Sequence, residues 1–106
     1  MGGRSESSGG DAVTPGGFEY DPNKSASNKA KHGVDFDEAQ IMWRDPRGLN
    51  VRTNYEPEER WALLATMGGR VWLAVWTPRG LNTRIVFVRR AAREEAAQYH
   101  AHNESR

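Results

Sequence analysis

Two glycine-containing turns divide the second half of the chain into short apolar segments, and this pattern constrains the fold more than any other feature. Gly68-Gly69 suits a tight hairpin, and Pro78-Arg79-Gly80 suits a slightly longer one. The segments between them are apolar on both faces, so one face can pack on helices while the other keeps surplus aromatic surface. The pattern predicts four antiparallel strands, at residues 48–53, 60–67, 71–77 and 83–90.

Helix signals lie before and after the strands. Asp21-Pro22 places a capping carboxylate ahead of a proline in the first turn, and Gly33 suits the left-handed end of a helix. Asp35 and Glu38 form a capping-box pattern that predicts a second helix, ended by Asp45-Pro46. A third, C-terminal helix is marked by Ala92, Ala96 and Tyr99. We therefore expect an α+β domain with two N-terminal helices, a four-stranded antiparallel sheet and a C-terminal helix.

Composition predicts one small domain, at residues 18–106. Residues 1–17 are rich in glycine and serine and are expected to form a disordered tail. No stretch approaches the roughly 20 apolar residues of a membrane span, so we expect a soluble, cytoplasmic protein. The absence of cysteine excludes a disulfide framework and a thiolate metal site, and His100 and His102 point to different sides of the expected helix. We expect neither a metal nor another cofactor.

The positive charge of the chain is strongly polarised. Between Arg60 and Arg93 there are seven arginines and no aspartate, glutamate or lysine, although the formal net charge is only +1. Arginine offers a planar fork of donors that matches phosphate or carboxylate, so this stretch favours geometric recognition of an anion. A nucleic-acid backbone and an acidic protein are the two candidates.

A set of short motifs, in order along residues 18–100, resembles the BrnT family of bacterial toxins. The resemblance implies a RelE-like fold, ribonuclease activity that shuts down translation, and a small antitoxin with a ribbon-helix-helix DNA-binding part. Contact with DNA would then be indirect, through the antitoxin, and no membrane is involved. Phe87 departs from the family pattern, which usually has a small or polar residue there. The motifs are Phe18-Glu19-Tyr20-Asp21-Pro22-Asn23-Lys24, Asn28, Lys31-His32-Gly33-Val34, Phe36, Glu38, Ala39, Glu59-Arg60, Arg84-Ile85-Val86 and Arg89-Arg90-Ala91.

Metal-free RNA cleavage needs a base, an acid and cations that stabilise the phosphorane. The family pattern points to Arg84 and Arg89 as phosphate ligands, and strand geometry offers Arg90 as an alternative. Arg60 is a further candidate catalytic residue. Strand alternation predicts Arg84 and Arg90 on one face and Arg89 on the other. A structural role, in ion pairs with Glu94 and Glu95 and in packing on aromatic rings, is the competing interpretation for each arginine.

Two residues are candidates for acid–base catalysis. His32 has a side chain whose ordinary pKa, near 6.5, suits proton transfer, although a histidine before a helix-ending glycine also bonds the last carbonyls. Glu59 is the alternative base, or a member of a loop-edge ion pair. For RNA binding the candidates are Lys31, Arg79, Arg90 and Trp76.

Two other functions fit the same sequence. A non-catalytic module could use the cationic surface to hold nucleic acid or an acidic protein. A degenerate toxin could act only in transcriptional regulation with its antitoxin, and the apolar Phe87 favours this alternative.

Overall fold

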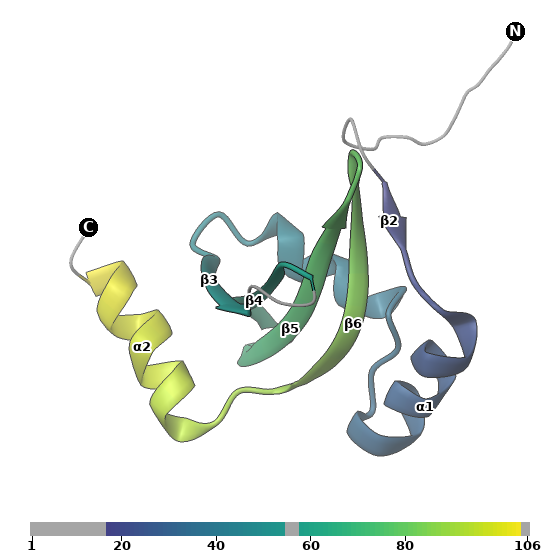
Figure 1. Ribbon diagram of the computed structural model, residues 1–106. Coiled ribbons are helices and arrows are strands. Elements are labelled where there is room, and N and C mark those ends of the chain that lie inside the picture. The colour runs from purple at the N-terminus through teal and green to yellow at the C-terminus, as the bar shows by residue number, and fades with distance from the viewer. Residues whose placement is uncertain (1–16, 55–57, 105–106) are drawn as a thin grey trace, which may run out of the picture.

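The computed structural model describes residues 17–54 and 58–104, which fold into a mixed sheet with helices on both faces (Figure 1). The expected α+β class is confirmed. Most of residues 1–17, assigned to a tail, lies outside the described residues. The elements in chain order are β2 (Phe18–Glu19), α1 (Pro22–His32), the 3₁₀ helix η1 (Glu38–Arg44), β3 (Leu49–Asn54), β4 (Arg60–Met67), β5 (Arg70–Arg79), β6 (Asn82–Arg90) and α2 (Arg93–Glu104).

The sheet has five strands in the order β2-β6-β5-β4-β3. The four antiparallel strands expected from the sequence are β3 to β6. The fifth strand was not expected: β2 runs parallel to β6, with Phe18 opposite Thr83 and Glu19 opposite Arg84. Two residues are too few to show a strand periodicity, so the sequence pattern could not reveal β2.

The turns and a bulge fix the register of the meander. Gly68 and Gly69 have φ values of 61° and 80°. A two-residue type I′ hairpin turn requires such positive φ values at both of its central residues. In β6, Phe87 pairs with Val75 while Ile85 pairs with Trp76, so Val86 is an extra, bulged residue. The bulge reverses the side-chain alternation beyond it.

This reversal corrects the expected faces of the three β6 arginines. Arg84 is opposite Thr77 and Arg89 is opposite Leu73, two β5 residues that share a face. Arg90 is opposite Trp72 and lies on the other face. The prediction that Arg84 and Arg90 share a face was therefore wrong, because simple alternation takes no account of a bulge.

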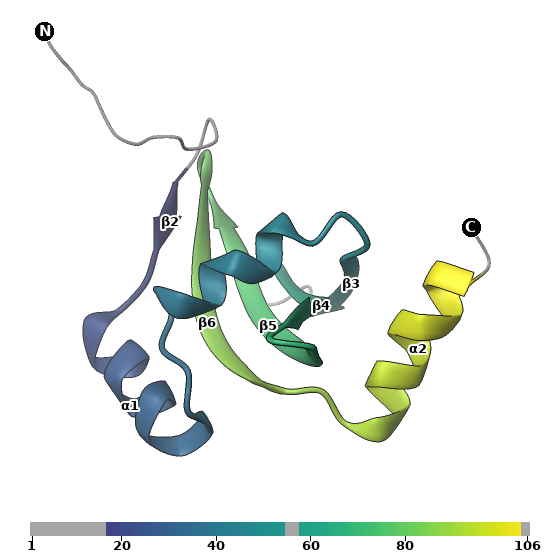
Figure 2. The ribbon, with the colours of Figure 1, turned by 180° about the vertical axis from the view of Figure 1, so that it is seen from behind.

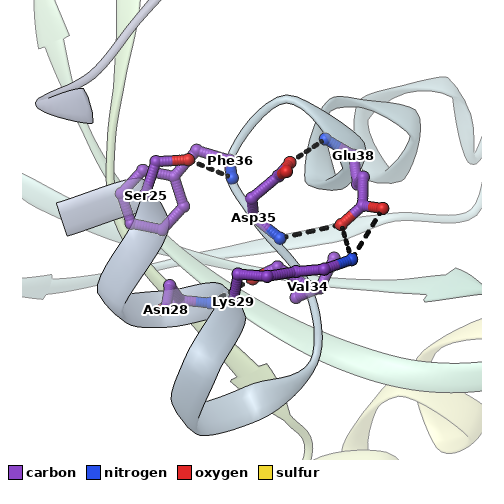
Figure 3. A network of polar contacts seen from close by, with 7 residues as sticks. All are labelled: Ser25, Asn28, Lys29, Val34, Asp35, Phe36 and Glu38. Carbon is purple, nitrogen blue, oxygen red and sulfur yellow. Dashed lines mark hydrogen bonds and ion pairs between the residues drawn. The ribbon is translucent and has the colours of Figure 1, made fainter. Parts of the chain in front are cut away.

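Local capping signals were confirmed. The Asp21 carboxylate accepts the Asn23 N–H at 2.9 Å, and Gly33, with φ 82°, donates its N–H to the Lys29 carbonyl. The Asp35 N–H donates to Glu38 and the Glu38 N–H donates to Asp35, at 2.9 and 2.7 Å, which completes the capping box (Figure 3).

The expected second helix is present as a seven-residue 3₁₀ helix. It has only the stretch from Glu38 to Arg44 before Asp45-Pro46, and so short a segment gains little from extending α-helical bonds. η1 nevertheless buries Ala39 and Met42 against the sheet. Figure 2 shows it crossing this face.

The helices pack on two faces, which differs from the expectation that one face would be left uncovered. On the η1 side, the core combines Phe36 and Met42 with Leu63, Ile85 and Val88 from the strands. On the opposite face, Tyr99 of α2 packs with three strand residues in a second, smaller core. These residues are Ala62, Leu64 and Leu73.

Asn28 joins α1 to the sheet. Its side-chain amide donates to the Val34 carbonyl at 2.8 Å and accepts the Val88 N–H at 3.1 Å. One turn earlier, the Ser25 hydroxyl accepts the Phe36 N–H at 2.9 Å (Figure 3). Both side chains are buried, so α1 supplies polar groups that satisfy backbone atoms of the following loop and of β6.

Asp45 anchors α2. Its carboxylate accepts the Tyr99 hydroxyl at 2.6 Å and both the N–H and the hydroxyl of Thr66. Burial raises the pKa of Asp45, but hydrogen bonds from Tyr99, Thr66 and Arg47 outweigh this effect and hold the pKa below its ordinary value. The ionised carboxylate therefore stabilises the folded state.

Asn28→Ala should destabilise the protein strongly. The substitution leaves the Val34 carbonyl and the Val88 N–H buried without partners, which should lower the free energy of unfolding by about 2–4 kcal/mol. Asn23→Ala, the same change at an exposed position of α1, is the matched control and should stay within about 0.5 kcal/mol. Urea unfolding measures both. Equal effects would show that the amide bridge contributes nothing.

Tyr99→Phe should destabilise the protein in a pH-dependent way. The change keeps the ring but removes a hydrogen bond to a charged group, so it should cost about 1–3 kcal/mol at neutral pH. Because the folded pKa of Asp45 is depressed, this stability is present above the unfolded pKa of about 3.9 and is lost as the pH falls through the folded pKa. The difference between wild type and variant should shrink below about pH 4 in urea unfolding. A difference independent of pH would contradict the anchoring role of the ionised carboxylate.

Candidate functional site

An arginine-rich hollow lies on the α2 face of the sheet, at the end away from Tyr99. Thr77 and Arg84 are direct cross-strand partners, and the Thr77 hydroxyl donates to the Glu59 carbonyl at 2.6 Å, beside Arg60. Arg79 lies two residues beyond Thr77 on the same face. We call this space, of about 160 Å³, the arginine hollow; its lining residues are Asp21, Lys24, Glu58, Arg60, Thr77, Arg79, Arg84, Ile85 and Val86.

Carboxylates hold the arginines of the hollow in place. Glu58 pairs with Arg60 at 3.2 Å and with Arg79 at 3.5 Å, so one carboxylate lies between two guanidinium groups. Glu19 of β2 pairs with Arg84 at 3.0 Å. Hydrogen bonds from Asn82 and Arg84 hold the pKa of Glu19 below its ordinary value, so Glu19 keeps its charge. These side chains are about one-third to one-half exposed, so the pairs can exchange with an anionic ligand.

A second hollow, of about 180 Å³, lies along α1. It shares Lys24 and Val86 with the arginine hollow, and it includes Lys31 and His32 from the end of the helix. We call it the lysine hollow. Its lining residues are Lys24, Ser27, Asn28, Lys31, His32, Phe36, Val86 and Phe87.

The structure divides the candidates from the sequence into several groups. Arg60, Arg79 and Arg84 come together in the arginine hollow. Lys31 and His32 lie in the neighbouring lysine hollow rather than beside the arginines.

Arg89 and Arg90 line neither hollow. The Arg89 guanidinium makes two bonds with Glu95 of α2, at 2.8 and 2.9 Å, and a hydrogen bond from this guanidinium to Glu95 raises the pKa of Arg89. Arg90 is exposed on the opposite face. The geometry gives Arg89 a structural role at the start of α2.

Glu59 and Trp76 belong to a cluster on the other side of the sheet. Glu59 accepts bonds from Arg52 at 2.7 Å and from the Trp61 indole at 2.9 Å, and these bonds hold its pKa below the ordinary value. Trp61 stacks on Trp76 with ring centroids 6.0 Å apart, and the Trp76 indole donates to Asn50. Neither Glu59 nor Trp76 lines the arginine hollow.

Glu58 and Lys24 were not among the site residues predicted from the sequence, where Glu58 was considered only as a member of a loop-edge ion pair with Arg60. Glu58 precedes Arg60 by two residues, and this spacing could have indicated a shared face. Lys24 carries no comparable signal, because its position in the hollow depends on how α1 packs against the β6 bulge.

Across residues 17–54 and 58–104, no three histidine, aspartate or glutamate side chains gather in a way that could hold a metal ion. Within the same ranges, no helix is long and apolar enough to cross a membrane.

Together these features define a small α+β protein whose sheet carries an arginine-rich hollow. A family model described as "Ribonuclease toxin, BrnT, of type II toxin-antitoxin system" matches residues 20–95. The chain therefore belongs to the BrnT family of ribonuclease toxins, and this system type implies an antitoxin partner. The matched segment contains every residue that lines the two hollows. Comparison with curated proteins found no match.

Proposed function

We propose that this toxin is an endoribonuclease that cleaves RNA in the arginine hollow without a metal ion, and that it thereby inhibits translation in the cytoplasm. The observation that carries the proposal is the meeting of Arg60, Arg79 and Arg84 around Glu58. Three guanidinium groups can bind the singly charged phosphodiester and stabilise the additional negative charge of the phosphorane, and the carboxylate between two of them can accept a proton. RNA supplies both the phosphate and the 2′-hydroxyl.

In the proposed mechanism, Glu58 removes the proton of the 2′-hydroxyl. The 2′-oxygen then attacks the adjacent phosphorus, and the arginines stabilise the negative charge of the phosphorane. The bond from phosphorus to the 5′-oxygen breaks, which leaves a 2′,3′-cyclic phosphate and a 5′-hydroxyl. Lys24 donates the proton to the leaving oxygen, because the other cations among the described residues of the hollow are arginines, which stay protonated.

Glu19 and Thr77 support this chemistry as positioning residues. The Glu19 carboxylate orients the Arg84 guanidinium, and Thr77 fixes the start of β4 through the Glu59 carbonyl. Each interaction limits the freedom of a side chain or strand end that contacts the phosphate. Such preorganisation lowers the cost of reaching the transition state.

The partner that we propose is a ribbon-helix-helix antitoxin. Its acidic and apolar side chains would cover the arginine hollow and exclude RNA, since the partly exposed guanidinium groups can donate hydrogen bonds to a carboxylate as well as to a phosphate. The antitoxin would also carry all contact with DNA.

Substitutions in the hollow should separate catalysis from binding. Glu58→Gln should lower the single-turnover rate about 10²- to 10⁴-fold, the contribution of a general base, without weakening RNA binding. Arg84→Ala should lower it about 10- to 1000-fold, and Arg84→Lys should recover only part of the loss. Arg70→Ala, at the exposed opposite end of β5, is the control. Wild-type rates for Glu58→Gln and Arg84→Ala at saturating RNA would remove both residues from the site.

Purified toxin should cleave RNA equally well in the presence of EDTA. The products should carry 2′,3′-cyclic phosphate and 5′-hydroxyl ends, which mass spectrometry identifies. Activity that requires an added divalent ion would contradict metal independence. RNA that is bound but stays intact under all conditions would instead support a non-catalytic binding module.

A further inference from the structure

The arginine and lysine hollows meet at Lys24 and Val86, and the inference drawn from this rests on the function proposed above. They share Lys24 from α1 and Val86 from the β6 bulge. The arginine hollow lies on the α2 face of the sheet, whereas the lysine hollow reaches Asn28 and Phe36 on the α1 side. A chain that leaves one hollow at the bulge therefore meets the other directly.

The lysine hollow uses one face of α1. Lys24, Ser27, Asn28 and Lys31 are spaced three, four and seven residues from the first, which places them on a single helical stripe. Lys24 and Lys31 are thus about 10 Å apart along the helix axis. This separation allows the two ammonium groups to contact successive phosphates of one strand.

The charges of this stripe have no carboxylate partner within the described part of the chain. Lys29, on another side of α1, forms an ion pair with Glu38 at 2.9 Å, so its charge is already paired within the protein. Neither Lys24 nor Lys31 forms such a pair with a described residue, and no carboxylate lines the lysine hollow. The hollow is therefore more purely cationic than the arginine hollow, where Asp21 and Glu58 are present.

The rest of the lining suits a nucleobase. Phe36, Val86 and Phe87 supply apolar surface, and His32 and Ser27 supply polar groups that can donate and accept hydrogen bonds. A hollow with an apolar wall and cationic ends matches a nucleotide better than it matches a free phosphate. Phe87, the residue that departs from the family pattern, contributes to this wall.

We propose that the lysine hollow binds the nucleotide next to the cleaved phosphodiester, and that RNA runs from the arginine hollow across the β6 bulge and along α1. Lys31 contacts the following phosphate and is a binding residue rather than a catalytic one. The toxin therefore needs RNA longer than a dinucleotide for full affinity.

The first test measures binding of 2′-O-methyl RNA, which cannot be cleaved because its 2′-oxygen is blocked. Wild-type toxin should bind a tetranucleotide tightly, and Lys31→Gln should weaken this binding about 3- to 10-fold and reduce the salt dependence by about one phosphate contact. Binding of the dinucleotide should not change. Arg70→Gln, which removes an equal charge at the far end of β5, should leave both affinities unchanged. Lys31→Gln and Arg70→Gln with equal effects on the tetranucleotide would overturn the path.

The second test uses cleavable RNA. Lys31→Gln should raise KM several-fold and leave kcat unchanged, because a ground-state contact outside the reacting atoms affects binding alone. Phe87→Leu, which keeps an apolar side chain in both cores but removes the ring, should also raise KM. A loss of kcat in Lys31→Gln would place Lys31 in the chemistry and overturn the proposal.

The two tests separate this inference from the proposed ribonuclease activity. If wild-type toxin cleaves no RNA but its binding depends on Lys31, the path is supported and the ribonuclease mechanism fails. If RNA is cleaved and binding is independent of Lys31, the mechanism is supported and the path fails.

Discussion

The side-chain amide of Asn28 is the interaction on which the position of the site depends. β2 covers only the first part of β6, so the Val88 N–H has no strand neighbour on that edge, and the Asn28 carbonyl oxygen replaces one. The same amide holds the Val34 carbonyl, which fixes the loop after α1. Because α1 supplies one wall of both hollows and β6 supplies the other, this buried bridge sets the distance between the walls.

Local features of the fold could be predicted from the sequence, whereas the features that position the site could not. The caps of α1, the box between Asp35 and Glu38 and the Gly68-Gly69 turn depend on neighbouring residues and were confirmed. The pairing of β2 joins residues more than 60 positions apart, and the bulge at Val86 reverses strand parity without a sequence signal. The family pattern grouped Arg84 with Arg89, but these residues bind different carboxylates at different ends of β6.

The arginines that cluster in the sequence are paired in the fold with acidic residues from other segments. Acidic residues from other segments approach the arginines of the sheet: Glu19 comes from β2 and Glu95 from α2. At Arg89, the paired carboxylate of Glu95 also accepts the Ala92 N–H at the start of α2, so this contact stabilises the fold. At Arg79 the paired carboxylate is that of Glu58, which Arg60 shares, and these exposed pairs include no backbone group of a helix start. The pair at Arg89 is therefore tied to a helix start, whereas the pairs at Arg60 and Arg79 are not.

The point at which the chain enters the sheet affects where a fusion partner can be attached. Gly17 and Glu19 are both bonded to the hairpin end of β6, so the chain joins the sheet beside Arg84. A fusion partner joined directly to Gly17 would therefore start beside Asn82 and Thr83, close in sequence to Arg84, which lines the arginine hollow. α2 packs on β4 and β5, away from the β2 edge of the sheet (Figure 1), so affinity handles and fluorescent labels belong at the C-terminal end.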